Sequence, residues 1–144
     1  MNTIKLEVLS LDKNGRLPTR NLETDAGWDL SASEDKVIFP GKIEFVPTGI
    51  AVVCPKGYYY EITGRSGLNL KKITSIHGII DATYCGQLFV GLRNESDNCY
   101  EIKIGDRIGQ IIVHQVIPTY VQGVGEVSEE YRGRGEAGWG SSGK

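Results

Sequence analysis

The sequence consists of short β-forming runs separated by turn residues. This alternation of strands and turns limits the possible folds of the chain more than any other feature. In IKLEVLSL, the apolar Ile4, Leu6 and Val8 alternate with Lys5 and Glu7, which is the period of a half-buried strand. Later runs are rich in β-branched and aromatic residues and end at proline, glycine, asparagine or aspartate. We find neither a repeat of fixed period nor an internal linker. The pattern predicts an all-β fold of the sandwich or barrel type.

The domain organisation follows from the length of the chain and from its C-terminal residues. A chain of 144 residues fits one domain with a core large enough to fold without disulfides. A helix of one or two turns fits only near residues 66–72. From residue 132 the sequence RGRGEAGWGSSGK contains five glycines, which lose the most conformational entropy on ordering. We therefore predict a β domain over residues 1–130 and a flexible C-terminal arm over residues 131–144.

Net charge and cysteine content disfavour several classes of protein. The net charge of −2 gives no overall field that favours nucleic acid or an anionic membrane. No apolar run reaches the length of a membrane span, and the N-terminal residues alternate instead of forming a signal sequence. The three widely spaced cysteines, and His77 and His114, indicate reduced thiols and structural histidines, not a disulfide framework or a zinc site. We predict a protein of the cytoplasm, or of the host-cell interior if its source is viral, that binds neither nucleic acid nor membrane.

Five segments interrupt the strand pattern with residues that strands disfavour. They are DAGWDL at 25–30, GRSGLNL at 64–70, HGIIDATYCGQ at 77–87, GDRIGQII at 105–112 and the C-terminal arm. In the second segment, Arg65 and Ser66 at the start of a short helix could bind an anion. A tight turn with Ser66 as the helix N-cap is the more common use of such residues.

The C-terminal arm also contains residues that could bind an anion. Arg134, Ser141 and Ser142 lie among glycines that let backbone N–H groups approach a phosphate closely. A disordered terminus is the common alternative. Trp139 argues against it, because disordered segments contain few aromatic residues. The pattern is typical of a lid that closes over a ligand.

Asp81 is the most informative carboxylate. It follows Ile79 and Ile80 directly, so we expect it to be partly buried, and a buried charge is normally paired, hydrogen-bonded or catalytic. A turn residue at the tip of a hairpin is an equally good interpretation. Asp29 carries a weaker signal, and Asp106 is most simply a turn residue. Two anion sites, these carboxylates and an aromatic lid together indicate a nucleotide polyphosphate site, with the base unspecified.

The five segments, in this order and at these spacings, resemble the five motifs of the trimeric dUTP pyrophosphatase (dUTPase) family. The matching stretches are DAGWDL, GRSGL, GIIDATYCGQ, GDRIGQII and RGEAGWGSSG, within residues 25–143. One such motif is weak evidence, whereas five in order make chance a poor explanation. The resemblance implies a jelly-roll-like β-barrel or sandwich and a homotrimer. It also implies an active site shared between subunits, with the arm supplied by a neighbour.

The activity that the resemblance implies is the Mg²⁺-dependent hydrolysis of dUTP to dUMP and pyrophosphate, by attack of water on the α-phosphorus. This reaction keeps uracil out of DNA and supplies dUMP for thymidylate synthesis. The Mg²⁺ ion would be held mainly by the three phosphates and water, which suits an ion that keeps several water ligands.

The resemblance also implies a role for each matched residue. Asp81 matches the carboxylate that orients and deprotonates the attacking water, and Tyr84 matches the tyrosine that packs on the deoxyribose and excludes a 2′-hydroxyl. Asp29 matches a first-motif aspartate that would contact the metal through water. In the arm, Trp139 would stack over uracil and Arg134 would meet the γ-phosphate. The other matched substrate-binding positions are Arg65, Ser66, Gly67 and Gln110 near the phosphates, Gly78 and Ile80 near uracil, and Gly140, Ser141 and Ser142 in the arm.

Five positions depart from the family pattern. Gly64 stands where the family usually has proline, and Trp139 where it more often has phenylalanine. Cys85 stands where many members have arginine, so any ion pair made there is missing. Asn69 and Gly109 each replace a more usual alanine. None of these changes removes a residue with a predicted catalytic role.

Three other functions remain open at this point. A dCTP deaminase, a relative on a similar fold, would bind cytosine and attack its ring. A nucleotide-controlled interaction protein would use dUTP to close the arm and change a surface for a partner. A purely structural β-sandwich would explain none of the five segments.

Overall fold

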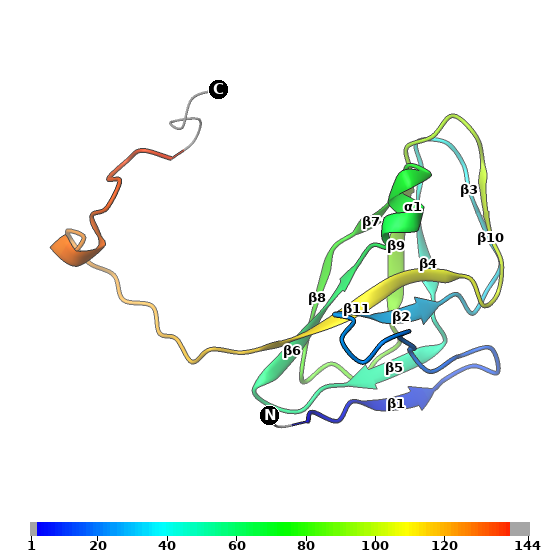
Figure 1. The fold of residues 1–144 in the computed structure, drawn as a ribbon, viewed down its shortest axis with the longest axis horizontal. Helices are drawn as coiled ribbons and strands as arrows, with labels where there is room; N and C mark the ends of the chain where they lie inside the picture. Colours follow the sequence, from blue (N-terminus) through cyan, green and yellow to red (C-terminus); the bar gives the residue numbers. More distant parts are fainter. Residues whose placement is uncertain (1–2, 139–144) are drawn as a thin grey trace.

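The computed structural model describes residues 3–138, and over these residues it contains eleven strands, one α-helix and one 3-10 helix (Figure 1). The strands are β1 Glu7–Ser10, β2 Trp28–Ser31, β3 Lys36–Ile38, β4 Ile43–Pro47, β5 Ile50–Val53, β6 Tyr58–Thr63, β7 Ile73–Ile76, β8 Gly78–Asp81, β9 Phe89–Asn94, β10 Tyr100–Ile102 and β11 Arg107–Gln115. The helices are α1, Ser66–Leu70, and the 3-10 helix η1, Glu129–Tyr131. None of the helices in residues 3–138 has the length and apolar character needed to cross a membrane.

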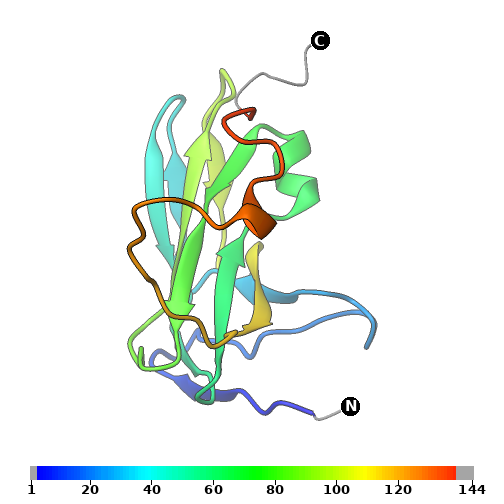
Figure 2. The ribbon, with the colours of Figure 1, turned by 90° about the vertical axis from the view of Figure 1, so that its left-hand side faces the viewer.

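The strands form four small antiparallel sheets. The largest has the order β2-β11-β6-β8, and a three-stranded sheet has the order β4-β9-β7. Two further pairs join β1 to β5 and β10 to β3. The sheets are arranged as a sandwich, as Figures 1 and 2 show from two directions. The predicted all-β, jelly-roll-like fold is therefore confirmed in its sandwich form.

The core forms where alternate strand residues turn inward. In β6, Tyr60 and Ile62 are buried, whereas Tyr59 and Glu61 are only half-buried. The Tyr60 hydroxyl donates a hydrogen bond of 2.8 Å to the carbonyl of Val52. Burial of this side chain raises the pKa of Tyr60 well above its usual value, because the phenolate would be poorly solvated.

Two local predictions have clear outcomes. The short helix expected near 66–72 is confirmed as α1. In the N-terminal run, Ile4, Leu6 and Val8 are half-buried as the alternation predicts, but strand pairing begins only at Glu7.

The alternative interpretation of Asp81, as a residue at the tip of a hairpin, is wrong because β8 and β9 do not pair. Strand β8 pairs with β6, whereas β9 pairs with β4 and β7, so residues 82–88 cross from one sheet to another. The local turn itself is present, since the Tyr84 N–H donates to the carbonyl of Asp81 at 3.0 Å. Turn residues show where a chain reverses, but they do not identify the strand with which the next segment pairs.

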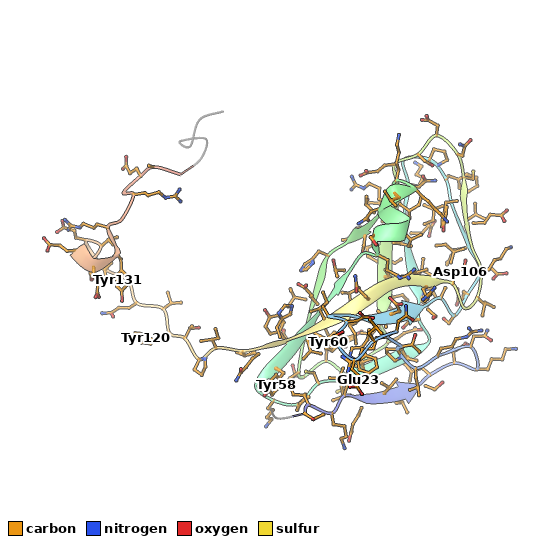
Figure 3. All side chains as sticks on the ribbon, in the orientation of Figure 1. Glu23, Tyr58, Tyr60, Asp106, Tyr120 and Tyr131 are labelled. Carbon is orange, nitrogen blue, oxygen red and sulfur yellow. The ribbon has the colours of Figure 1, made fainter. Side chains whose placement is uncertain are left out.

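The C-terminal residues lie apart from the sandwich. Strand β11 ends at Gln115, and residues 116–138 are exposed and extend away from the sheets (Figure 1). The side chains of Tyr120 and Tyr131 lie on this extension, far from the core residue Tyr60 (Figure 3). The domain boundary predicted between residues 130 and 131 stays a prediction.

Candidate active site

Three of the five segments meet at one carboxylate, that of Asp29 in β2. Its Oδ1 accepts a hydrogen bond of 3.0 Å from Nε of Arg65, and its Oδ2 lies 3.5 Å from Nη1 of Arg107. Arg65 directly precedes α1, and Arg107 begins β11. The Asp29 side chain is only 17% exposed and Arg65 is mostly covered, so water screens their ion pair weakly, whereas Arg107 is half-exposed and its pair with Asp29 is screened more. The first segment therefore orients the arginines of the second and fourth.

The amide of Gln110 makes a further connection between the same segments. Gln110 in β11 lies opposite Asp29 in β2 and Thr63 in β6. Its Nε2 donates a hydrogen bond of 2.8 Å to the carbonyl of Gly64. Its side chain also covers Gly27, where a Cβ would collide with the amide oxygen. Glycine at position 27 therefore lets Gln110 reach the second segment.

The second segment forms α1, but Ser66 is not its N-cap. Arg65 occupies the N-cap position with extended backbone, φ −110° and ψ 138°, and makes no side-chain capping hydrogen bond. Ser66 and Gly67 follow in the first turn and are exposed. The N-cap interpretation of Ser66 is wrong because Arg65, whose guanidinium is held by Asp29, takes that position.

A pocket of about 420 Å³ lies between α1 and the turn that precedes β11. Arg65, Gly67 and Lys71, within or next to α1, line it together with Tyr100 of β10 and Arg107 of β11. Three cationic side chains therefore surround one cavity. A larger pocket of about 680 Å³ lies beside the N-terminal residues, and none of the predicted site residues lines it.

Asp106 lies in the turn before β11, where Figure 3 labels it, and it is one of the residues that line the smaller pocket. Its Oδ2 accepts a hydrogen bond of 2.9 Å from the N–H of Lys103, and Gly105 has a φ of +90°. The prediction that Asp106 is a turn residue is confirmed.

The third segment places Asp81 at the end of the edge strand β8, where it is exposed. The expectation that Asp81 is partly buried is wrong. Side chains alternate along a strand, so Asp81 shares its face with Ile79, which is 54% exposed, and not with Ile80, which packs against the core. An apolar pair before an aspartate therefore does not establish that the aspartate is buried.

Tyr84 lies in the turn that follows β8. Its hydroxyl donates a hydrogen bond of 2.8 Å to the carbonyl of Gln87. Its ring lies against Gly86, where a Cβ would come within 2.6 Å of the hydroxyl oxygen. These contacts hold the half-exposed ring within the turn that begins at Asp81. A Cβ added at Gly78, at the start of β8, would meet no atom of the described structure within 4 Å.

One chain does not bring Asp81 to the other three segments. Along β6, Tyr59 is paired with Asp81 and Thr63 with Gln110. These two positions are separated by about 13 Å along the strand, and β8 and β11 lie about 10 Å apart across the sheet. Asp81 and Gln110 of the same chain are therefore too far apart for both side chains to act at the same phosphorus atom of a substrate.

The two histidines lie on either side of Glu61. Their Nε2 atoms are each 3.4 Å from a carboxylate oxygen, and the ring of His114 stacks on Tyr59 with 5.1 Å between centroids. Residues 3–138 contain no group of three His, Cys, Asp or Glu side chains that could hold a metal ion. Cys54 is buried, which raises the pKa of its thiol, and its sulfur is free.

Among the arm residues with predicted roles, Arg134 belongs to the described part of the chain, where it is exposed. Arg132 is held locally, because its Nη2 lies 2.5 Å from Oε1 of Glu126 and its Nε donates to the carbonyl of Val127 at 2.9 Å. Trp139, Gly140, Ser141 and Ser142 lie outside the described residues, and their predicted roles stay predictions.

Arg107 is the site residue that sequence reasoning missed. It lies in the fourth segment, but no local pattern connects it with Asp29, which is distant in the sequence. The available signal was a cationic residue at the start of a strand-like run, within a segment already identified as unusual. Its partner became apparent only from the pairing of β2 with β11.

The fold and the pocket define a class, namely an antiparallel β-sandwich with a cationic cavity suited to a phosphorylated ligand. The family follows from comparison with known proteins, since residues 13–143 match the model of the dUTPase family. The chain is similar to the deoxyuridine 5′-triphosphate nucleotidohydrolase of Clostridium tetani, at 34% identity with 100% of both chains covered. It is 42% identical to that of Corynebacterium jeikeium, with 99% of this chain and 95% of the relative covered.

Solved structures agree with the sequence comparisons. The dUTPase of Staphylococcus bacteriophage 80alpha with dUpNHpp has a TM-score of 0.87 and 33% identity, and the match covers 97% of this chain and 99% of that chain. A mutant dUTPase of phage phi11 of S. aureus, which coordinates a structural Mg(II) ion, has a TM-score of 0.82 and 28% identity, covering 87% and 99%. This chain belongs to the dUTPase family.

Proposed function

We propose that this protein hydrolyses dUTP to dUMP and pyrophosphate, by attack of water on the α-phosphorus. The observation that carries the proposal is the meeting of three segments at Asp29, next to a pocket lined by three cations. Guanidinium groups bind phosphate oxygens through paired hydrogen bonds, so this arrangement suits a polyphosphate. Arg65 and Arg107 are oriented before substrate arrives, and their charges therefore stabilise phosphate charge without reorganisation.

Asp81 is the proposed general base. Its carboxylate is exposed, so it is accessible to a water molecule that attacks the substrate. A positioned general base contributes about 10²- to 10⁴-fold to a rate. Arg65, Ser66, Gly67 and Gln110 would bind the phosphates.

In the proposed mechanism, Mg²⁺ binds together with the substrate. Within residues 3–138 no cluster of metal-binding side chains is present, and the carboxylate of Asp29 already contacts two guanidinium groups. A Mg²⁺ ion bound by phosphates and water needs no protein cage, and it would neutralise part of the phosphate charge. The contact of Asp29 with this ion through water stays a prediction.

Selection of base and sugar is assigned to the third segment. Strand β8 is at the edge of its sheet, so one side of its backbone has no strand partner in the described part of the chain. Backbone groups near Gly78 and Ile80 could therefore pair with uracil. Tyr84, whose ring is 43% exposed, would pack on the deoxyribose and exclude a 2′-hydroxyl.

We propose a homotrimer whose active sites are shared between subunits. The separation of Asp81 from Gln110 within one chain supports it, because a complete site then needs Asp81 from another copy. The outer face of β4-β9-β7 is also apolar: Phe45, Ile76 and Phe89 are 59%, 37% and 45% exposed. Apolar patches of this kind mark interaction surfaces.

The arm, residues 131–144, would close over the site of a neighbouring subunit. Trp139→Ala should raise KM for dUTP about tenfold or more, since stacking of a base on an aromatic side chain is worth about 1–3 kcal/mol. The melting temperature should stay unchanged if Trp139 acts on substrate only. Unchanged KM would contradict the proposed stacking.

The decisive assay measures pyrophosphate release from dUTP, dTTP, dCTP and UTP in parallel, with Mg²⁺. Release from dUTP alone would establish the reaction and the discrimination against the thymine methyl and the 2′-hydroxyl. Conversion of dCTP to dUTP would identify a deaminase instead. A folded protein that binds dUpNHpp but releases no pyrophosphate would favour a nucleotide-controlled interaction protein.

A further inference from the structure

Lys71 lines the cationic pocket although it belongs to none of the five segments. It follows α1 directly, where its backbone N–H donates to the carbonyl of Leu68 at 3.0 Å. Its side chain is exposed, and its ammonium nitrogen lies 5.9 Å from the ring centre of Tyr100, which also lines the pocket. The backbone of Lys71 therefore ends the helix, while the residue is part of the pocket lining.

The other charges of the pocket already have partners. Arg65 and Arg107 both contact Asp29. The carboxylate of Asp106 accepts a hydrogen bond from the backbone of Lys103 in its own turn. Lys71, by contrast, forms no ion pair with a carboxylate of residues 3–138. Arg65 and Arg107 share the single carboxylate of Asp29, so Lys71 is the pocket cation without a carboxylate partner among residues 3–138.

The contact with Tyr100 does not account for this placement. It lies near the outer limit of a cation–π interaction, about 6 Å, so it orients the side chain but contributes little to the fold. A lysine ammonium has three N–H donors, and a contact with an aromatic face leaves them free for an anion. Arg65 and Arg107 line the same pocket, so an anion bound there would be attracted by three cationic side chains.

We propose that Lys71 is a further substrate-binding residue, whose ammonium group binds the terminal phosphate of the nucleotide and, after cleavage, the pyrophosphate product. The inference rests on the proposed function, because it takes the ligand to be a nucleoside triphosphate. A cavity of about 420 Å³ falls within the usual size of small-molecule sites. Lys71 then discriminates between nucleotides by the number of phosphates and takes no part in recognition of the base.

The test is calorimetric titration of the full-length protein, with Mg²⁺, with three probes: inorganic pyrophosphate, dUpNHpp and dUMP. The variants are Lys71→Gln, Lys71→Arg and, as a matched control, Lys56→Gln, an exposed lysine outside the pocket. Loss of one charge-assisted contact should weaken binding of pyrophosphate and dUpNHpp about tenfold in Lys71→Gln. Binding of dUMP should not change, and Lys71→Arg should restore most of the affinity.

Kinetics give an independent readout. Lys71→Gln should raise KM for dUTP about tenfold and leave kcat nearly unchanged, because uniform binding affects KM alone. Unchanged binding of pyrophosphate in Lys71→Gln, or an equal loss for dUMP, would overturn the proposal. The binding probes require no turnover, so a wild-type protein that binds dUpNHpp but releases no pyrophosphate would refute the proposed function and still test Lys71.

Discussion

The two halves of the candidate site differ in how completely one chain builds them. Around Asp29, the first, second and fourth segments are joined by ion pairs with Arg65 and Arg107, and by the hydrogen bond from Gln110 to Gly64. Around Asp81, the third segment is exposed at the end of an edge strand. The phosphate-binding half is therefore preorganised within the chain, whereas the reacting half depends on substrate and on a second copy.

This difference has a physical origin. Arg65 and Arg107 lie close together at Asp29, and this mostly buried carboxylate offsets the repulsion between the two guanidinium groups. Asp81 keeps its contact with water until a ligand arrives, so the free protein needs no compensating charge. The Asp29 carboxylate thus contributes to the stability of the fold, whereas the Asp81 carboxylate contributes chemistry alone.

The largest expected effect is at Asp81. Asp81→Asn should lower kcat by about 10²- to 10⁴-fold, or roughly 3–5 kcal/mol in the barrier, because it removes the base. Binding of dUpNHpp and the melting temperature should be almost unchanged. Pyrophosphate release and calorimetry measure the two effects, with the exposed Asp97→Asn as control. An equal loss of binding and turnover would show that Asp81 is not the base.

Asp29→Asn should lower stability and weaken substrate binding, in contrast to Asp81→Asn, which should lower turnover. It leaves Arg65 and Arg107 close together without their carboxylate, at a site only 17% exposed, so the free energy of unfolding should fall by about 1–3 kcal/mol. KM for dUTP should rise, because the arginines lose their orientation. Urea unfolding and steady-state kinetics measure these effects. Wild-type stability in this variant would remove the proposed difference between the two halves.

Tyr60 lies in β6, the strand that connects the two halves. Tyr60→Phe should cost about 1–2 kcal/mol at neutral pH, because the carbonyl of Val52 loses its donor. Because the pKa of Tyr60 is higher in the folded than in the unfolded protein, neutral Tyr60 contributes its full stabilisation below the unfolded-state pKa, near 10. The wild type loses this stabilisation as the pH rises from that value through the folded-state pKa. The two proteins should therefore converge in stability at alkaline pH. Urea unfolding across pH, with the exposed Tyr131→Phe as control, would detect a persistent gap that contradicts this account.

The smallest effect is expected at Gly86. A Cβ there would come within 2.6 Å of the Tyr84 hydroxyl and displace the ring, so Gly86→Ala should weaken discrimination between dUTP and UTP about fivefold. Stability should hardly change, because the turn is at the surface. The ratio of kcat/KM for the two nucleotides measures it. Gly123→Ala, where the added Cβ meets open space, is the control, and an unaltered ratio would separate Tyr84 from sugar selection.

The sequence by itself determined the elements of this protein. Alternation in IKLEVLSL and the later runs, together with the turn residues between them, predicted the all-β fold and the single short helix. Five segments of unusual composition predicted where the chemistry lies, and their order predicted the family. These features are local, since strand period and turn preference depend on residues that are neighbours in the chain.

Only the tertiary structure decided how those elements meet. It paired β8 with β6, not with β9, so no hairpin forms at Asp81, and it left Asp81 exposed on the face that Ile79 shares. It brought Arg107 to Asp29, and it placed Lys71 and Arg107 in the lining of one cavity. No local sequence pattern indicated either arrangement. Such contacts join residues far apart in the sequence, and they depend on strand register and on packing against the common core. The residues of a strand determine which of its faces is apolar, whereas the strands with which it pairs depend on the whole fold.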